Sequence, residues 1–424
     1  MLSREDNERI TRVGAGTPGG EMLRRYWWPV VLSSEIPESG REPVRARLLG
    51  EDLLLFKDTE GRVGLVDAYC PHRRAPLFFG RNEDCGLRCV YHGWKFDVDG
   101  NCTDLPSEPV DSPMKAKVKL TSYPTHEAGG VLWAYLGPAE TMPGAPDFEW
   151  TRVPKTHQFV SKTYEECNYL QALEGGLDTS HSSFLHRNNM KDKSQLRSRD
   201  GAPSIEVHET DYGYYYVSQR NLGDDRSYAR VYHYVMPCQQ MRPNTQARNG
   251  SGRAEVPKFN GHIWVPIDDE QTMVYNWMCG FDESVPLTQE FIDDFESIYG
   301  RGQEDMIPGT ARLKKNLSND YLIDRDLQRN GSFTGITGIN TQDFALQEGM
   351  GPIVDRSKEY LGTSDKAIIS MRKLMLNAVK EVEQGNRPAG ADPATHRDLR
   401  PHDDILPAGT DWREAYEDAL KAKW

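Results

Sequence analysis

The sequence predicts an α+β protein, in which a small all-β domain is followed by a larger domain with an antiparallel sheet flanked by helices. Short strand patterns separated by turn residues fill residues 44–69. The second half of the chain instead mixes longer strand patterns with two long helical patterns, at residues 289–299 and 366–384. Strands interspersed with long helices in this way are typical of the α+β class.

The first part of the chain is expected to be dominated by strands. Residues 1–26 form a polar lead-in that ends in a short helix over residues 20–26. Strand patterns then follow at residues 44–50, 52–58, 61–69, 117–123 and 131–136. Residues 27–140 are therefore predicted to be the all-β domain. A linker is indicated by Pro143, Gly144 and Pro146.

Residues 145–424 are predicted to form the larger domain. Its strand patterns lie at residues 214–219, 229–236, 262–266 and 272–278. The helical pattern at 366–384 is preceded by the capping residues of Thr363-Ser364-Asp365 and followed by Gly385, which are start and stop signals of a helix. The segment 386–410 is rich in Pro and Asp, so we expect it to be irregular.

Composition excludes several classes of function. The formal net charge of −13 argues against a nucleic-acid partner, because phosphate binding needs clustered Lys and Arg. The opening MLSREDNERITRV lacks the apolar core of a signal peptide, and no run of roughly 18 apolar residues occurs. A cytoplasmic protein without a membrane span is expected. The 7 cysteines are an odd number, and without an export signal they favour metal ligation over disulfides.

The strongest motif pairs one cysteine with one histidine, twice. Cys70-Pro-His72 is followed after sixteen residues by Cys89-Val-Tyr-His92. Two thiolates and two imidazoles presented from two loops match a Rieske [2Fe–2S] centre, in which two His replace two Cys on one iron. Imidazole ligands raise the potential of such a cluster to roughly −150 to +300 mV. The cluster would therefore accept electrons from a reductase of lower potential.

A structural zinc site is the alternative, since Cys2His2 also satisfies tetrahedral zinc. Zinc fingers normally pair Cys with Cys and His with His, whereas each half of this motif carries one of each. The mixed halves favour the Rieske cluster. Cys85 lies four residues before Cys89, but it breaks the spacing to His92, so we expect it to be a small buried side chain.

The stretch CPHRRAPLFFGRNEDCGLRCVYHGWKFDVDG closely resembles the Rieske domain of aromatic-ring oxygenases, in particular the phthalate 4,5-dioxygenase group. The resemblance runs nearly end to end. It includes the opening MLSREDNERITRVGAGTPGGEMLRRYWWPV and the later NDYLIDRDLQRNGSFTGITGINTQDFALQEGMGPIVDRSKEYLGTSD. It implies the oxygenase component of a Rieske non-haem iron oxygenase.

A second metal centre is indicated by His181 and His186. Two histidines five residues apart can converge on one metal if the segment is helical with a local distortion, and two His with one carboxylate form the open-sided triad of non-haem Fe(II) oxygenases. With Asp178 they resemble the family's D-x2-H-x4-H. The resemblance places the carboxylate ligand at Asp343, with Glu348 as the fallback.

Two further carboxylates have supporting roles in this interpretation. The resemblance implies that Asp178 hydrogen-bonds an iron-ligating His and a Rieske His of a neighbouring subunit, which agrees with the rule that metal-bound His donates its other N–H to a carboxylate. The assembly implied is a ring, a homotrimer or stacked trimers. Asp355 is expected to be a structural partner of Arg356.

The implied activity is oxidation of an aromatic carboxylic acid with O₂. Electrons from NAD(P)H would arrive through a separate reductase or ferredoxin, and the products would be those of phthalate-like ring hydroxylation or of O-demethylation of a methoxy acid such as dehydrodivanillate. A pure electron carrier and a zinc-stabilised binding protein are the rival functions. Candidates to bind the substrate carboxylate are Arg220, Arg230 and Arg242, each of which could equally be a surface arginine.

Two other features have weaker interpretations. Gly14-Ala-Gly16-Thr-Pro-Gly19 satisfies G-x-G-x-x-G, but no strand precedes it, so we expect a turn and no dinucleotide site. Basic residues crowd the Rieske segment and could either be solvated or guide an acidic ferredoxin or reductase. These basic residues are Arg73, Arg74, Arg81, Arg88 and Lys95.

Overall fold

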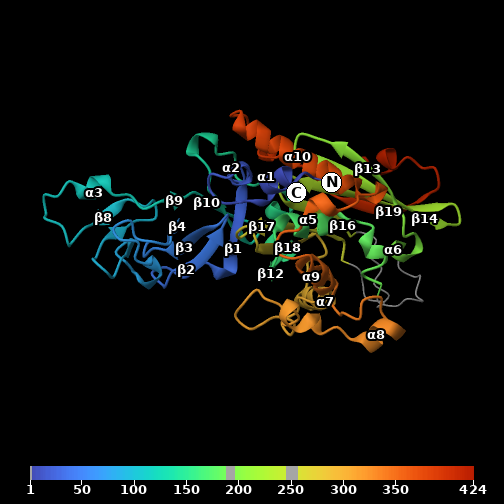
Figure 1. Ribbon diagram of the computed structural model, residues 1–424, viewed down its shortest axis with the longest axis horizontal. Coiled ribbons are helices and arrows are strands. Elements are labelled where there is room, and N and C mark those ends of the chain that lie inside the picture. Colours follow the sequence, from blue (N-terminus) through green and yellow to red (C-terminus); the bar gives the residue numbers. More distant parts are fainter. Residues whose placement is uncertain (1, 188–195, 245–255) are drawn as a thin grey trace.

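The computed structural model describes residues 2–187, 196–244 and 256–424 (Figure 1). A part built of short strands lies at one end of the molecule, and a larger part of long strands and helices occupies the rest. Every pair of neighbouring strands in the described sheets is antiparallel. Sheets and helices occur together, so the α+β class is confirmed.

The smaller part contains two four-stranded sheets and one three-stranded sheet. The first has the order β2 (Val44–Leu48), β3 (Glu51–Lys57), β4 (Val63–Asp67), β9 (Ser122–Tyr123). The second has the order β5 (Arg81–Glu83), β6 (Gly86–Arg88), β7 (Lys95–Phe96), β8 (Cys102–Asp104). The three-stranded sheet has the order β1 (Trp27–Leu32), β11 (Val131–Tyr135), β10 (Thr125–Ala128).

Strand β3 belongs to two hydrophobic cores at once. Successive side chains of a strand point to opposite faces. Leu53 and Leu55 pack into the main core, whereas Leu54 and Phe56 pack into the core that contains Cys70 and Cys89. Because both faces of β3 are buried, its sequence is an unbroken apolar run rather than an alternating one.

The larger part is organised around an eight-stranded sheet. Its order is β12 (Gln158–Glu165), β18 (Thr272–Gly280), β17 (Lys258–Pro266), β16 (Gln239–Pro243), β15 (Arg226–Val235), β14 (Gly213–Gly223), β13 (Ser204–Glu209), and β19 (His402–Pro407) also pairs with β15. Helix α5 (Tyr169–Leu177) contacts β17 and also the two helices α9 (Ile339–Gly349) and α10 (Lys366–Glu383). The remaining helices are α4 (Glu149–Arg152), α6 (Leu196–Arg199), α7 (Gln289–Tyr299), α8 (Arg325–Asn330) and α11 (Trp412–Tyr416).

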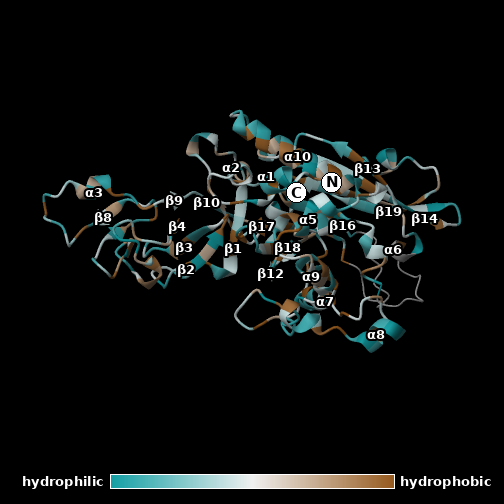
Figure 2. Cartoon of the chain, in the orientation of Figure 1, coloured by the Kyte–Doolittle hydropathy of each residue, from teal (hydrophilic) through white to brown (hydrophobic). Residues whose placement is uncertain are grey.

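Helix α10 shows why the long helices could be predicted. Its buried residues include Ala367, Met371, Met375, Ala378 and Val382, which recur every three or four positions and so form one face. Figure 2 shows apolar and polar residues alternating along this helix. The helix ends before Gly385, whose φ of 80° suits a residue without a Cβ. No helix among the described residues is long and apolar enough to cross a membrane.

Three local predictions were wrong. The lead-in contains helix α1 (Arg4–Thr11) as well as α2 (Pro18–Leu23), and both contact α10. The expected strand at 117–123 starts at the last residue of helix α3 (Met114–Lys117), and only the two residues of β9 within it form a strand. The segment expected to be irregular contains β19, which pairs with the backbone of β15 and packs Leu406 against a small hydrophobic core. The Gly14–Gly19 segment forms a turn, as expected, and its last two residues begin α2.

Candidate metal centres

The Cys70 and Cys89 loops have the same backbone hydrogen bonds. Cys70 N–H donates to Ala75 O at 2.9 Å, and Cys89 N–H donates to Trp94 O at 2.8 Å. The carbonyl of each cysteine accepts a hydrogen bond from the residue four positions later. Arg74 N–H donates to Cys70 O at 2.9 Å, and Gly93 N–H donates to Cys89 O at 2.9 Å. Each loop follows a strand, β4 or β6, so the sheets fix where the two cysteines emerge.

The two loops bring four potential ligand side chains together. Cys70 and Cys89 are buried free thiols, with exposures of 1% and 3%. The rings of His72 and His92 lie 4.4 Å apart, and His72 stacks on Trp94 at 4.3 Å. Both Nδ1 atoms are buried and have no hydrogen-bond partner among the described residues. Buried donors and acceptors are normally satisfied, so two orphaned imidazole nitrogens beside two thiols fit a bound cluster.

The protonation tendencies of these groups agree with metal binding. Burial raises the pKa of Cys70 to about 11, and the neighbouring Cys89 adds to the effect. A thiolate at Cys70 therefore needs a cation beside it, which the iron of a bound cluster would supply. Burial, with His72 and Arg73 nearby, lowers the pKa of His92 and keeps its imidazole neutral and able to bind metal.

Most of the basic residues near this centre have acidic neighbours. Arg74 pairs with Asp67, Arg81 with Glu83, and Lys95 lies 3.9 Å from Asp84. Arg88 pairs with Glu83 and Asp104 and also donates to Gly93 O at 2.6 Å, so it braces the loop that carries His92. Local pairing weakens the hypothesis of a basic docking patch. Cys85 lies in the β5–β6 turn, where its sulfur accepts a hydrogen bond from Thr59, and the structure keeps it apart from the four ligand candidates.

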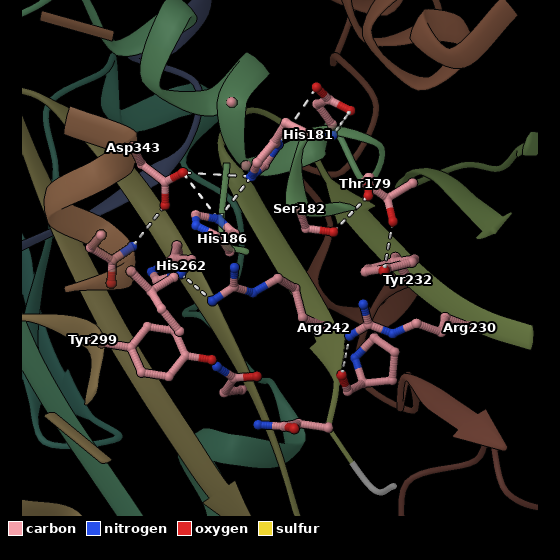
Figure 3. A pocket seen from close by; sticks show the side chains of 18 of the residues that line it. Thr179, His181, Ser182, His186, Arg230, Tyr232, Arg242, His262, Tyr299 and Asp343 are labelled. Carbon is pink, nitrogen blue, oxygen red and sulfur yellow. Dashed lines mark hydrogen bonds and ion pairs between the residues drawn. The ribbon is translucent and has the colours of Figure 1, made fainter. Parts of the chain in front are cut away.

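The second candidate centre lies where α5 ends. A 3-10 turn, His181–Ser183, follows the helix, and α9 brings Asp343 from far along the chain. The Nε2 atoms of His181 and His186 are 3.0 Å apart, and Asp343 Oδ1 lies 3.5 Å from the first and 3.3 Å from the second (Figure 3). Their ligand atoms all lie within 4.8 Å of one another. Three such donor groups facing one point suit a divalent cation in an open-sided site.

Asp178 is placed beside this cluster by a turn rather than by a shared helical face. Helix α5 ends at Leu177, and Asp178 Oδ1 accepts the backbone N–H of Ser180 at 2.7 Å and of His181 at 3.3 Å. Its Oδ2 lies 3.5 Å from His181 Nδ1. Burial opposes ionisation, but the hydrogen bond and charge of His181 outweigh it and lower the pKa of Asp178. The carboxylate is therefore charged at neutral pH.

The alternative carboxylates have other partners. Glu348 is buried on the far turn of α9, where it accepts from Glu166 N at 2.9 Å and from the Tyr321 hydroxyl. It therefore does not join the histidine cluster. Asp355 caps a 3-10 turn through Ser357 N, at 3.1 Å, and is not the partner of Arg356 as expected. Arg356 instead pairs with Glu174 on α5 at 2.9 Å.

Two residues that orient the ligand candidates of the second centre were not predicted, because nothing in the sequence marks them. His186 Nδ1 contacts Gln342 Oε1 at 2.8 Å, and Gln342 Nε2 donates to Ile336 O at 2.8 Å. On the same helix, Asn340 Nδ2 reaches Asp343 Oδ2 at 3.4 Å. Asn340 lies three residues before Asp343 and Gln342 lies one residue before it. These positions become informative only once α9 is known to face the histidines.

A cavity of about 390 Å³ opens beside the second centre, and His181, His186 and Asp343 all line its wall. Apolar and aromatic walls are supplied by Tyr232, Trp264, Tyr299 and Ile339. Arg230 and Arg242 also line it, whereas Arg220 does not and instead donates to Thr179 O at 2.7 Å. Of the three candidate arginines, two therefore remain for substrate binding.

The two arginines of the cavity differ in their partners. Arg230 donates to Pro243 O at 2.8 Å and lies 3.7 Å from Asp403. Arg242 contacts Nε2 of His262 (Figure 3), and no carboxylate of the described residues pairs with it. Burial, and then the charge of Arg242, lowers the pKa of His262 far below its usual range, so His262 is neutral and accepts the guanidinium N–H. The cavity thus holds a half-buried cation that an anion could neutralise.

Comparison with known proteins gives two family matches. Residues 26–124 match the Rieske [2Fe-2S] domain, and residues 134–423 match the family described as LigXa C-terminal domain like. A solved structure, NdmA of Pseudomonas putida CBB5 with caffeine, shares the fold with a TM-score of 0.61 at 18% identity, over 89% of this chain and 95% of that one.

Three similar proteins align over almost the whole chain. The phthalate 4,5-dioxygenase oxygenase subunit of Pseudomonas putida is 39% identical over 98% of this chain and 94% of that protein. The 3-chlorobenzoate-3,4-dioxygenase oxygenase subunit of Comamonas testosteroni is 37% identical over 99% of each. The 5,5'-dehydrodivanillate O-demethylase oxygenase subunit of Sphingobium sp. is 34% identical over 100% of this chain and 90% of that protein.

Proposed function

The chain belongs to the Rieske non-haem iron oxygenases, as the terminal oxygenase component, and we propose that it oxidises an aromatic carboxylic acid in the cavity beside His181 and His186. The similar proteins act on phthalate, 3-chlorobenzoate and dehydrodivanillate, by dioxygenation or O-demethylation. They favour neither of the rival functions, a pure electron carrier or a zinc-stabilised binding protein.

The proposal assigns two metal centres to the chain. The [2Fe–2S] cluster would be held by Cys70, His72, Cys89 and His92, and the Fe(II) by His181, His186 and Asp343. When bound, the cluster supplies electrons and the Fe(II) activates O₂. The protein's own contribution is orientation: the three side chains converge at the wall of the cavity, where they would hold the Fe(II) next to a bound substrate.

The observation that carries the substrate class is the side chain of Arg242, which is half-buried in the wall of the cavity. A guanidinium matches a carboxylate with two parallel hydrogen bonds, which fixes both the distance and the plane of the ligand. His262 holds one N–H of Arg242 and leaves other donors of the guanidinium for a ligand. The aromatic walls would pack against the ring, as is usual in small-molecule sites.

The electron path gives Asp178 its role in the proposal. Its side chain remains 25% exposed, so a group from outside the chain can reach the carboxylate. Val90 and Tyr91, next to His92, are 58% and 56% exposed, and an assembly would cover them. We infer a homotrimer, or stacked trimers, in which His92 of the partner subunit approaches Asp178. The electrons would come from NAD(P)H through a separate reductase or ferredoxin in the cytoplasm.

The test is product analysis with the oxygenase, a surrogate reductase and NADH. Phthalates, halobenzoates and methoxylated aromatic acids are compared with their methyl esters, which keep the ring but lose the charge. We expect turnover of at least one acid and little of its ester. Replacing Arg242 by Gln should raise KM by roughly 10- to 100-fold, since a hydrogen bond to a charged group contributes about 1.5–3 kcal/mol.

The matched control is Arg413→Gln, which removes a surface arginine that pairs with Glu206; neither residue lines the cavity. Its KM should match that of the wild type. Equal turnover of acid and ester, or an unchanged KM in the Arg242 variant, would refute recognition of a carboxylate. Light scattering of the purified protein tests the trimer separately.

A further inference from the structure

We propose that Gln342 is a positioning residue that holds His186 in the tautomer with its Nε2 lone pair facing the metal position. The inference rests on the proposed role of His186 as a ligand. It adds a residue to the site that contacts neither substrate nor metal and acts through His186 alone.

The hydrogen bonds of Gln342 determine which way its amide points. Ile336 O can only accept, so the Gln342 atom 2.8 Å from it must be the NH₂ group. The amide oxygen is then the atom turned toward His186, at 2.8 Å from Nδ1. An oxygen there accepts, so Nδ1 carries the proton and Nε2 of the neutral ring keeps its lone pair. That lone pair faces Asp343 and His181.

Burial makes Gln342 hard to replace. Gln342 and His186 are 1% and 6% exposed, so bulk water does not reach the Nδ1 position. If the amide were removed, the Nδ1 proton would have no acceptor, and the ring could turn or move its proton to Nε2 and block the metal. The structure therefore assigns the same role to two residues: Gln342 accepts from Nδ1 of His186, as the carboxylate of Asp178 does from Nδ1 of His181.

A neutral amide suits this position better than a second carboxylate. Asp343 is the next residue along α9 and already brings one negative charge to the buried site. An ionised carboxylate at position 342 would be desolvated beside a like charge, so it would take up a proton. A protonated Glu keeps one C=O acceptor and one O–H donor, which are the two functions that the amide of Gln342 performs.

The test measures metal affinity rather than turnover. Full-length protein with its cluster is treated with a chelator to remove the mononuclear iron and is then titrated anaerobically with Co(II), whose visible bands report the ligand set. Gln342→Met keeps the length of the side chain but offers no amide, so we expect Co(II) to bind about 10- to 100-fold more weakly, with shifted bands. Gln342→Glu should restore affinity to within a few-fold of wild type.

Gln171→Met is the matched control. Gln171 is also buried, on α5, and bonds the backbone of Gln347, Gly351 and Val354 near the end of α9 without touching a histidine. We expect wild-type Co(II) affinity from it, with the cluster absorbance intact in every variant. The inference fails if Gln342→Met binds Co(II) as the wild type does, or if Gln171→Met weakens binding equally.

His186→Ala separates this inference from the proposed function. Loss of Co(II) binding in His186→Ala together with wild-type binding in Gln342→Met would remove Gln342 from the mechanism and leave the metal site in place. Wild-type Co(II) binding by His186→Ala would instead overturn the metal site, and with it the role of Gln342.

Discussion

Replacing Asp178 by Asn tests the proposed electron path, because the structure shows which of its two oxygens the change removes. Oδ1 accepts backbone N–H groups from Ser180 and His181, at 2.7 and 3.3 Å. The amide oxygen of Asn must stay there, since an NH₂ group cannot accept. The NH₂ then replaces Oδ2 and points a donor at Nδ1 of His181. The turn is kept, but the hydrogen bond to the imidazole is lost.

The size of the effect follows from the number of groups that share Oδ2. Loss of one carboxylate behind a metal-bound histidine commonly costs about 10- to 100-fold. If the same oxygen also receives His92 of the partner subunit, the change removes both contacts together with the charge. We therefore expect electron transfer to slow by about 100-fold or more, or about 2.7 kcal/mol in barrier height. The contents of both metal centres should remain those of the wild type.

The assay is single-turnover stopped-flow of the pre-reduced protein with substrate and O₂, following reoxidation of the cluster by its visible absorbance. Asp355→Asn is the control, because Asp355 also accepts a backbone N–H through one oxygen yet lies outside the cavity wall. Wild-type reoxidation in the Asp178 variant would show that this carboxylate is a bystander. Loss of iron would show that it holds the site together instead.

Three further outcomes can be measured on single variants. Cys89→Ser should abolish the visible spectrum of the cluster, and Cys85→Ser should leave it intact. The reverse result would mean that Cys85, and not Cys89, is the cluster ligand. Asp343→Ala should lose the mononuclear iron while Glu348→Gln retains it, as metal analysis would show, and iron kept in the Asp343 variant would refute that ligand. Burial, and then the charge of Glu348, raises the pKa of Glu165 well above its usual 4.5. The folded protein therefore keeps a proton on Glu165 that the unfolded chain releases. As the pH rises from 4.5 to the raised pKa, the free energy of unfolding falls by about 1.4 kcal/mol per pH unit. Glu165→Gln should remove this slope in denaturant titrations at several pH values, and equal slopes in variant and wild type would contradict it.

The features that could be predicted from sequence are those set by local patterns. Helix α10 repeats its apolar residues at helical spacing, and β3 is a short apolar run between turns. The cysteine and histidine of each cluster loop are within four residues of each other, so one loop suffices to bring them together. Such short-range spacing does not depend on contacts with distant parts of the chain, so it can be recognised from the sequence.

The features that could not be predicted depend on partners far along the chain. Helix α1 looks polar because Asn7 lies on its buried face, where it donates to Val354 O at 3.1 Å and accepts from Arg356 at 3.0 Å. Strand β19 begins with polar residues, including Asp403 and Asp404, and it forms where its backbone pairs with that of β15. In both segments a tertiary contact overrides local propensity.

The buried charges around α5 show how distant residues fix the geometry of the second centre. Glu174 lies four residues before Asp178 and pairs with Arg356 at 2.9 Å and Arg372 at 2.6 Å. Burial alone would favour protonation, but the two guanidinium groups outweigh it and lower the pKa of Glu174. Buried ion pairs add little net stability, yet removing one partner is costly, so they specify one arrangement strongly. Here they hold the last turn of α5 in one place. Because Asp178 and His181 follow directly from that turn, the orientation of His181 between Asp178 and Asp343 depends on arginines outside the group of ligand candidates.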